Sequence, residues 1–445
     1  MRAKLILLSA FVVGIVGGSL ASGCQTYDFE PVDPLALAQT TKGDVIRARA
    51  LKPNMMVLLD TSGSMTLPAD GTLAACQVSN PTNPARPLCG DQGNPPCNVN
   101  TCPTRWSELR SAMGAFLGNS GTVARLGLTT YPAAAAGQCG ASSSVRIPIP
   151  KLEEVRDDEV SKLQDKANAI SDVILNQIAL DSSSATPDRP SPIGGTPTSQ
   201  SLRFVGEQPE LQAQDREDFV LLLTDGLPNC NAGNPNGGNA TTCRCTQSPC
   251  PTTYPALLCL DKDASVAAVT DLRTQKQIRT IVIGFGADFT SGRPETQAGA
   301  ETLNEMAVAG EFARNLDCTT DAQCGANDTC NPTTRKCNRR FYLASNQAEL
   351  ANALNEIISR VDPSKVCQLA LEQSQRPSDE NLIVVYLGSP DDATLPSLPR
   401  VSSTGETNWE LNETGILFLG SACQRIQNSD DDNPVKIEVR AVQRK

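Results

Sequence analysis

Five oxygen-bearing side chains are spaced along this chain in a way that suits a hard divalent cation. Asp60, Ser62 and Ser64 directly follow one apolar run, and Asp225 directly follows a second. Thr196 lies between them, in a tight loop that starts with two glycines. Carboxylate and hydroxyl oxygens are the ligands that Mg²⁺ and Mn²⁺ prefer, whereas Zn²⁺ favours nitrogen and sulfur. The spacing therefore predicts a site for Mg²⁺ or Mn²⁺.

The order of these residues also resembles a known family motif. Asp60-x-Ser62-x-Ser64, then a Thr, then an Asp, resembles the metal-ion-dependent adhesion site of von Willebrand factor A domains. The first motif alone fits a serine-rich turn that caps a helix, because Asp and Ser are common in turns. Three elements in the family's order, each after a suitable structural element, favour the metal site.

The resemblance implies a role for each ligand. Ser62 and Ser64 would bind the metal directly through their hydroxyls. Asp60 and Asp225 would bind it directly or through water, and Thr196 would join in the ligand-competent state. Because few of these ligands are anionic, the ion would stay electrophilic and accept a carboxylate or another oxygen from a partner.

The composition argues against several other functions. The chain has 445 residues, enough for one large domain and a smaller one. Its net charge of −11 makes a nucleic-acid partner unexpected, because phosphate binding requires a basic face. It contains no His, which removes His-based nucleophile systems and His-ligated zinc. We expect a binding protein rather than an enzyme; a hydrolase using a metal-bound water is the enzymatic alternative, with no general base visible.

The N-terminus has the pattern of a bacterial export signal. Arg2 and Lys4 precede an apolar stretch, and small residues then lead to Cys24. The segment ending at Cys24 resembles a lipobox, although its Leu stands one place further from the cysteine than usual. We expect residues 1–23 to be a lipoprotein signal peptide, Cys24 to be lipidated and residues 24–50 to form a tether. The alternative is a plain secretory signal cut nearby.

The cysteine content fits export to an oxidising compartment. Seventeen cysteines less Cys24 (17 − 1) leave sixteen, an even number that predicts a disulfide framework. Cys367 and Cys423 are expected to bridge within the C-terminal part. Zinc knots are the alternative for residues 243–245 and 318–337, but export and the absence of His argue against them.

The remaining pattern alternates strands with helices. This alternation predicts an α/β fold with a doubly wound, mainly parallel sheet, as in von Willebrand A and Rossmann-like domains. Ligands bind such sheets at the carboxyl ends of the strands, where Asp60 and Asp225 stand. We expect strands at 55–59, 125–131, 145–149, 219–224, 279–285 and 341–344, and helices at 106–117, 157–180, 199–205, 264–275, 297–309 and 347–361.

The chain divides into two predicted folded parts. Residues 51–361 are expected to form the A-like domain, and 362–445 a β-rich module with Trp409 as a core anchor and strands near 381–388, 415–420 and 435–442. Cys-rich insertions interrupt the domain at 67–104, 228–260 and 317–338. The first two follow the metal-bearing strands and should emerge on the ligand face, as stapled decoration or as part of recognition.

These features predict a metal-dependent adhesin on the cell surface, anchored in the outer membrane by lipid. Its ligand would be an extracellular surface, polymer or protein with an acidic group. The architecture also resembles myxobacterial outer-membrane adhesion lipoproteins of gliding motility, which implies envelope motility proteins as partners. The alternative is an envelope scaffold or assembly lipoprotein whose A domain binds another envelope protein, facing the periplasm.

Overall fold

The computed structural model describes most of the chain from residue 52 to residue 441. The predicted signal peptide 1–23, the lipidation site Cys24 and the tether 24–50 lie outside the described residues. Within the described part, no helix is both long and apolar enough to cross a membrane. The description omits 1–51, 80–86, 92, 134–137, 158, 213–215, 226, 247–249, 287–293, 325–327, 345, 362–366, 372–378, 390–391, 413–414, 428–434 and 442–445.

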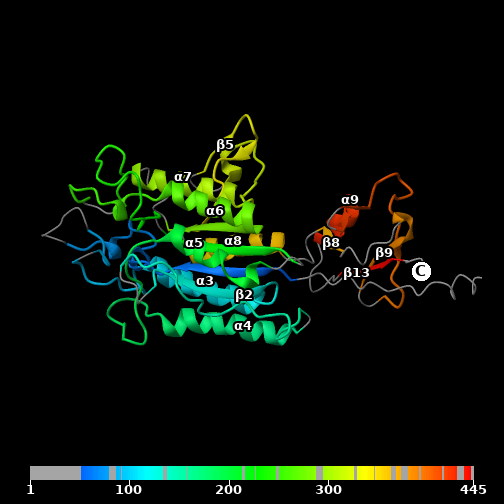
Figure 1. The fold of residues 1–445 in the computed structure, drawn as a ribbon, viewed down its shortest axis with the longest axis horizontal. Helices are drawn as coiled ribbons and strands as arrows, with labels where there is room; N and C mark the ends of the chain where they lie inside the picture. Colours follow the sequence, from blue (N-terminus) through cyan, green and yellow to red (C-terminus); the bar gives the residue numbers. More distant parts are fainter. Residues whose placement is uncertain are drawn as a thin grey trace, which may run out of the picture.

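A five-stranded parallel sheet forms the centre of the larger part (Figure 1). All four neighbouring pairs are parallel. Every residue of the strands Asn54–Asp60 and Asp218–Thr224, which are neighbours inside the sheet, is buried. Their sequences are therefore mostly continuous apolar runs rather than alternating patterns. The predicted α/β class is confirmed. In spatial order the strands are β2 (Arg125–Tyr131), β1 (Asn54–Asp60), β3 (Asp218–Thr224), β4 (Ile278–Phe285) and β7 (Tyr342–Ala344).

Helices cover both faces of the sheet (Figure 1). Met55, Val57 and Leu59 of β1 pack into one core, and Met56 and Leu58 pack into the other, because successive side chains of a strand point to opposite faces. The first core is completed by α3 (Arg105–Ser120), α4 (Val160–Asp172) and α8 (Gln347–Val361), and the second by α5 (Thr198–Gly206), α6 (Lys262–Lys276) and α7 (Pro294–Ala309).

Short elements complete this part and bring one correction. The strand predicted at 145–149 does not form, and only Ile147 makes a bridge, to Leu128. Pro148 and Pro150 lack the N–H groups that a strand would donate. Short 3₁₀ turns lie at Gly63–Thr66, Ala74–Cys76, Pro209–Leu211, Ala256–Leu258 and Asp321–Cys324, and a π-helical turn extends α4 at Val173–Gln177. A further 3₁₀ turn, Glu380–Leu382, lies in the C-terminal part.

All sixteen cysteines after Cys24 form disulfides, so the predicted framework is confirmed over the zinc alternative. Each of the three insertions carries two internal bridges, and the third adds a hairpin of β5 (Cys330–Asn331) and β6 (Lys336–Cys337). One bridge joins separate loops of the domain, as described below. The pairs are 76–102, 89–97, 139–230, 243–259, 245–250, 318–330, 324–337 and 367–423.

The C-terminal part is β-rich and has its own core, in which Trp409 is buried as predicted. One helix, α9 (Gly420–Gln427), was not predicted. It starts at Gly420, whose φ of +49° ends the preceding strand, and it buries Ala422 and Ile426 one turn apart. The two antiparallel sheets contain β10 (Ser397–Leu398), β9 (Ile383–Gly388) and β13 (Lys436–Ala441), and β11 (Trp409–Leu411), β12 (Gly415–Phe418) and β8 (Gln368–Ala370).

Candidate metal site

The predicted ligands gather where the strand order of the sheet reverses. From β1 the chain first adds β2 on one side and later adds β3 on the other. The connections therefore diverge between β1 and β3, which is where doubly wound sheets commonly bind ligands. Leu59 is level with Leu223 in the register, so Asp60 at the end of β1 stands beside Thr224, and Asp225 follows.

Two serine hydroxyls and one carboxylate form a continuous chain of oxygens at this point. Ser62 Oγ lies 3.0 Å from Ser64 Oγ, and Ser64 Oγ donates a hydrogen bond of 2.9 Å to Asp225 Oδ1. Neighbouring oxygens on one octahedral Mg²⁺, each about 2.1 Å from the ion, are themselves about 3 Å apart. The spacing of these three oxygens thus fits a shared Mg²⁺ or Mn²⁺. Ser64 is partly exposed, so the chain of oxygens reaches solvent.

Asp60 is held rigidly behind these oxygens. Its side chain is fully buried, with Oδ1 accepting a 2.8 Å bond from the Ser62 N–H and Oδ2 a 2.7 Å bond from the Thr224 hydroxyl. Burial, followed by the nearby charge of Asp225, raises the pKa of Asp60 to about 7. A cation bound here would therefore stabilise the ionised form of Asp60.

The Thr196 loop packs directly against the Asp60–Ser64 loop. The Gly63 N–H donates a 2.9 Å bond to the carbonyl of Gly194. Thr196 is 4% exposed. Its N–H donates a 2.7 Å hydrogen bond to Asn229 Oδ1, and its carbonyl oxygen accepts a 2.9 Å hydrogen bond from the Asn229 N–H. The fold thus brings Thr196 to the site, although among the described residues its hydroxyl makes no hydrogen bond to the other four predicted ligands.

A disulfide between two connecting loops explains Gly195, the second of the paired glycines before Thr196. Cys139 follows β2 and Cys230 follows β3, and their bridge lies against Gly195. A Cβ on Gly195 would come within 2.5 Å of Cys230 Sγ, so no larger residue fits. Gly194 has a φ of +93°, which also favours glycine.

Arg105 is a site residue that the sequence did not reveal. Its Nη1 donates a 2.8 Å bond to Asp225 Oδ2, and the side chains of the pair are 6% and 0% exposed. Asp225 therefore presents Oδ1 to Ser64 and Oδ2 to a guanidinium. Arg105 lies 41 residues after Ser64, at the end of a disulfide-rich insertion, so no local motif connects it with the predicted ligands.

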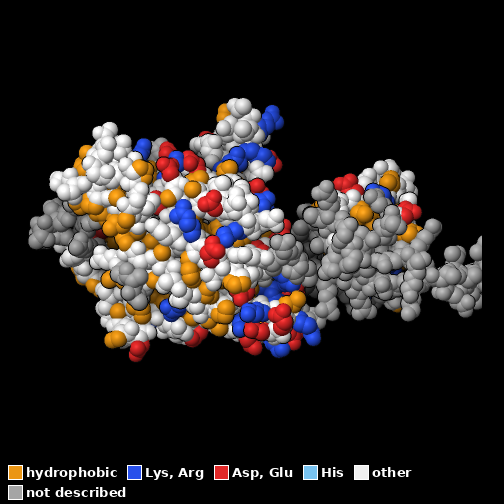
Figure 2. Space-filling view, in the orientation of Figure 1, with side chains coloured by type: hydrophobic (Ala, Val, Ile, Leu, Met, Phe, Trp, Pro, Cys, Tyr) orange, Lys and Arg blue, Asp and Glu red, His pale blue; other side chains and the backbone are white. Residues whose placement is uncertain are grey.

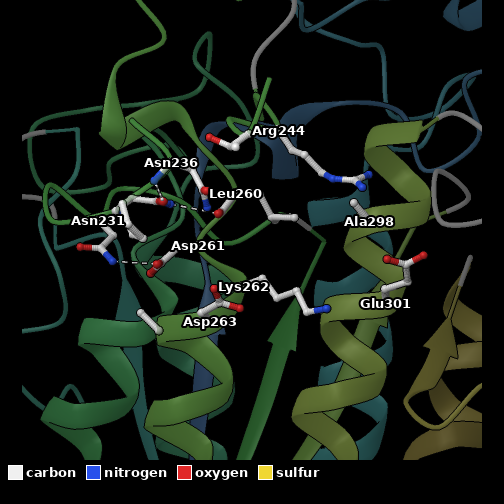
Figure 3. Close-up of a pocket in the computed structure, with 13 residues that line it drawn as sticks. Asn231, Asn236, Arg244, Leu260, Asp261, Lys262, Asp263, Ala298 and Glu301 are labelled. Carbon is white, nitrogen blue, oxygen red and sulfur yellow. Dashed lines mark hydrogen bonds between the residues drawn. The ribbon is translucent and has the colours of Figure 1, made fainter. Parts of the chain in front are cut away.

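A polar cavity of about 220 Å³ lies on the same side of the fold (Figure 3). The second insertion and the first turns of α6 and α7 form its walls. Asn231 donates a 2.8 Å bond to Asp261 Oδ1, and Ser199 donates a 2.6 Å bond to Asp261 Oδ2. This buried carboxylate thereby joins the insertion to α5, the helix that begins just after Thr196. Figure 3 shows Arg244 extending from the insertion toward α7.

Comparison with known proteins gives structural similarity only. No sequence family and no curated protein matches the chain. The open form of the SpaC pilus adhesin of Lactobacillus rhamnosus GG is 13% identical, with a TM-score of 0.38, over 90% of this chain and 40% of that one. The PilB minor pilin of Streptococcus sanguinis is 16% identical, with a TM-score of 0.37, over 70% of this chain and 62% of the pilin chain. Manganese-loaded TRAP of Plasmodium vivax is 12% identical, with a TM-score of 0.32, over 69% of this chain and 74% of the TRAP chain.

Proposed function

We propose that this protein is a metal-dependent adhesin of the cell surface, and that Asp60, Ser62, Ser64, Thr196 and Asp225 hold a Mg²⁺ or Mn²⁺ ion. The observation that carries the proposal is the row of oxygens formed by Ser62, Ser64 and Asp225, with separations of 3.0 and 2.9 Å at the switch point of the sheet. When bound, the ion supplies a positive centre that binds an oxygen of the ligand.

The protein's own residues fix the position of this centre. At the end of a fully buried strand, the Asp60 carboxylate accepts hydrogen bonds from Ser62, Thr224 and Tyr131. The Thr196 loop is hydrogen-bonded both to the Asp60–Ser64 loop and to Asn229. Such a rigid set of groups is suited to binding, because little freedom is lost when a ligand is captured.

The second insertion favours an adhesive role for the face that carries the site. The second insertion, residues 228–260, contains one charged residue, Arg244. Figure 2 likewise shows few charged side chains at the end of the molecule that carries the first two insertions. The ligand would therefore be recognised through one oxygen on the metal and through hydrogen bonds to neutral polar groups. This chemistry fits an extracellular polymer or protein with an acidic group.

The finer placement of the protein is also part of the proposal. A lipid on Cys24 would anchor it in the outer membrane, where it would support gliding motility. Protease digestion of intact cells tests the placement, because an adhesin must be cut from outside. Complete protection in intact cells, with cutting after lysis, would instead favour an envelope scaffold protein that binds another envelope protein.

The metal site is tested by Ser64→Ala with Ser111→Ala as the matched control. Ser111 is an exposed serine on α3 whose hydroxyl bonds only to the backbone of its own helix. We expect Ser64→Ala to weaken Mn²⁺ binding at least about tenfold, because a direct ligand is lost, and Ser111→Ala to leave it unchanged. Isothermal titration with Mn²⁺ measures both.

Adhesion is tested with the same two variants. Purified wild-type protein should bind an extracellular polymer preparation in Mg²⁺ and lose this binding in EDTA. At a Mg²⁺ concentration that only just saturates the wild type, Ser64→Ala should bind less polymer than the wild type does, because its site is then mostly empty. Equal binding by wild type in Mg²⁺ and in EDTA would show that the site does not carry adhesion.

A further inference from the structure

Arg105 brings a fixed positive charge to the carboxylate at the centre of the proposed site. Its Nη1 lies 2.8 Å from Asp225 Oδ2 and 3.5 Å from the carbonyl oxygen of Ser64. Both charged side chains are almost fully buried, so water screens the interaction poorly. A guanidinium stays charged at every physiological pH, so this charge is permanent.

The surroundings of Arg105 fix its position. It is the first residue of α3, directly after Thr104, whose side chain accepts a 3.1 Å bond from the Ser107 N–H while the Ser107 hydroxyl bonds back to the Thr104 N–H. The guanidinium passes close to Gly286, where a Cβ would lie 3.0 Å from Nε. Gly286 has a φ of +120°, so a side chain there is disfavoured for two reasons.

A second buried ionic group in the domain shows a different arrangement. Arg125 and Arg216 both pair with Asp157, at 2.7 and 3.2 Å, near the opposite end of the sheet. Among the described residues, no chain of hydroxyl oxygens accompanies that group. At the proposed metal site, by contrast, the carboxylate that pairs with arginine also accepts from Ser64 through its second oxygen. Asp225 is thus shared between a permanent cation and the position where a metal would bind.

We propose that Arg105 is a built-in counter-charge that weakens binding of the divalent cation. This inference rests on the proposed metal site and concerns what sets the affinity of that site for its metal. The guanidinium already neutralises Asp225, so a metal gains less from this carboxylate and is repelled by the arginine. The bound ion is also left more electrophilic, because Asp225 shares its charge with Arg105. The site would therefore bind its metal more weakly, and the bound metal would bind an anionic ligand more tightly.

The experiment compares Mn²⁺ binding by wild type, Arg105→Met and Arg105→Lys. We expect Arg105→Met to bind Mn²⁺ about tenfold more tightly, since the competing charge is gone while Ser64 still orients Asp225. Arg105→Lys keeps the charge and should remain within about threefold of wild type. A purely structural role would give the opposite pattern, with both variants binding more weakly than wild type.

Arg110→Met is the matched control. Arg110 lies on the same helix and donates to the carbonyl of Leu175, away from the site, so its removal should leave Mn²⁺ affinity unchanged. Circular dichroism confirms folding of each variant, and Arg105→Gln replaces Arg105→Met if the latter does not fold. Equal or weaker binding by the uncharged variant, with wild-type binding that depends on Ser64, overturns this inference alone. Absence of Mn²⁺ binding to wild type overturns both it and the proposed function.

Discussion

At the scale of single residues, Asp60 connects the candidate site to the stability of the protein. Its carboxyl group is buried, and its pKa is raised to about 7. In the unfolded chain an Asp titrates near 3.9. Between these values the folded protein retains a proton that the unfolded chain has released, so stability falls as the pH rises toward 7.

Asp60→Asn should remove this pH dependence. In EDTA, the free energy of unfolding of wild type should fall relative to Asp60→Asn as the pH rises from about 4 to 7 and level off above that. The full difference is up to about 4 kcal/mol, at about 1.4 kcal/mol per pKa unit. Urea titrations of both proteins across this pH range measure the difference. Parallel stability curves would show that Asp60 titrates normally.

The sequence was sufficient to predict the site residues whose place follows from their local position in the chain. Asp60 and Asp225 each follow a buried strand, and parallel strands end at one edge of the sheet, so their proximity could be inferred. Arg105 and Asn229 could not be found this way. Their contacts with Asp225 and Thr196 depend on how long, disulfide-linked connections fold back onto the site. Local spacing carries no information about such distant contacts.

At the scale of elements, the best-predicted segment is α8. Its predicted start after Asn346 is confirmed, and the Asn346 side chain accepts a 3.0 Å bond from the Glu349 N–H. Periodicity and capping both lie within the helix itself. The segment 145–149 was wrongly predicted as a strand, because Pro148 within it and Pro150 directly after it cannot donate backbone hydrogen bonds to a neighbouring strand. Helix α9 was missed because it has only 8 residues, and one apolar pair four residues apart, Ala422 and Ile426, is too little periodicity to indicate a helix.

At the C-terminal end of α8, Arg360 adds polar contacts to the packing of the buried Ile357 and Val361. The Arg360 guanidinium lies 3.9 Å from the centre of the Phe312 ring and donates a 2.5 Å bond to the Tyr342 hydroxyl. Arg360→Ala should lower the free energy of unfolding by about 1–2 kcal/mol, because a partly buried cation–π contact is lost together with the hydrogen bonds to the Tyr342 hydroxyl and the Ala313 carbonyl. Urea denaturation measures the change.

Arg273→Ala is the comparison for that prediction. Arg273 pairs with Glu311 at 2.5 Å, but the two side chains are 32% and 56% exposed. An exposed pair of this kind contributes little, so the expected loss is about 0.5 kcal/mol or less. Similar losses in both variants would show that the packing of Arg360 on Phe312 does not hold α8.

At the scale of the whole molecule, the Cys139–Cys230 bridge is the most consequential crosslink. It spans 91 residues, whereas the Cys245–Cys250 bridge spans 5. Closing the longer loop restricts the unfolded chain more strongly. On the chain-entropy account, replacing both cysteines of the long bridge by Ser should cost about 4.5 kcal/mol, and replacing the short pair about 2 kcal/mol. Thermal and urea denaturation of the two double variants measure the difference, and equal losses would contradict this account.

In the proposed adhesive role, the same bridge would have a mechanical consequence. If the chain is pulled from its ends until the domain unravels, the 90 residues between Cys139 and Cys230 (230 − 139 − 1) stay within a covalent loop. At about 3.5 Å per extended residue, roughly 320 Å of contour length is withheld from extension. Thr196, Asp225 and strand β3 all lie inside that loop, whereas Asp60 lies outside it. Force therefore reaches one half of the site along the backbone, and bypasses the other half through a single sulfur–sulfur link.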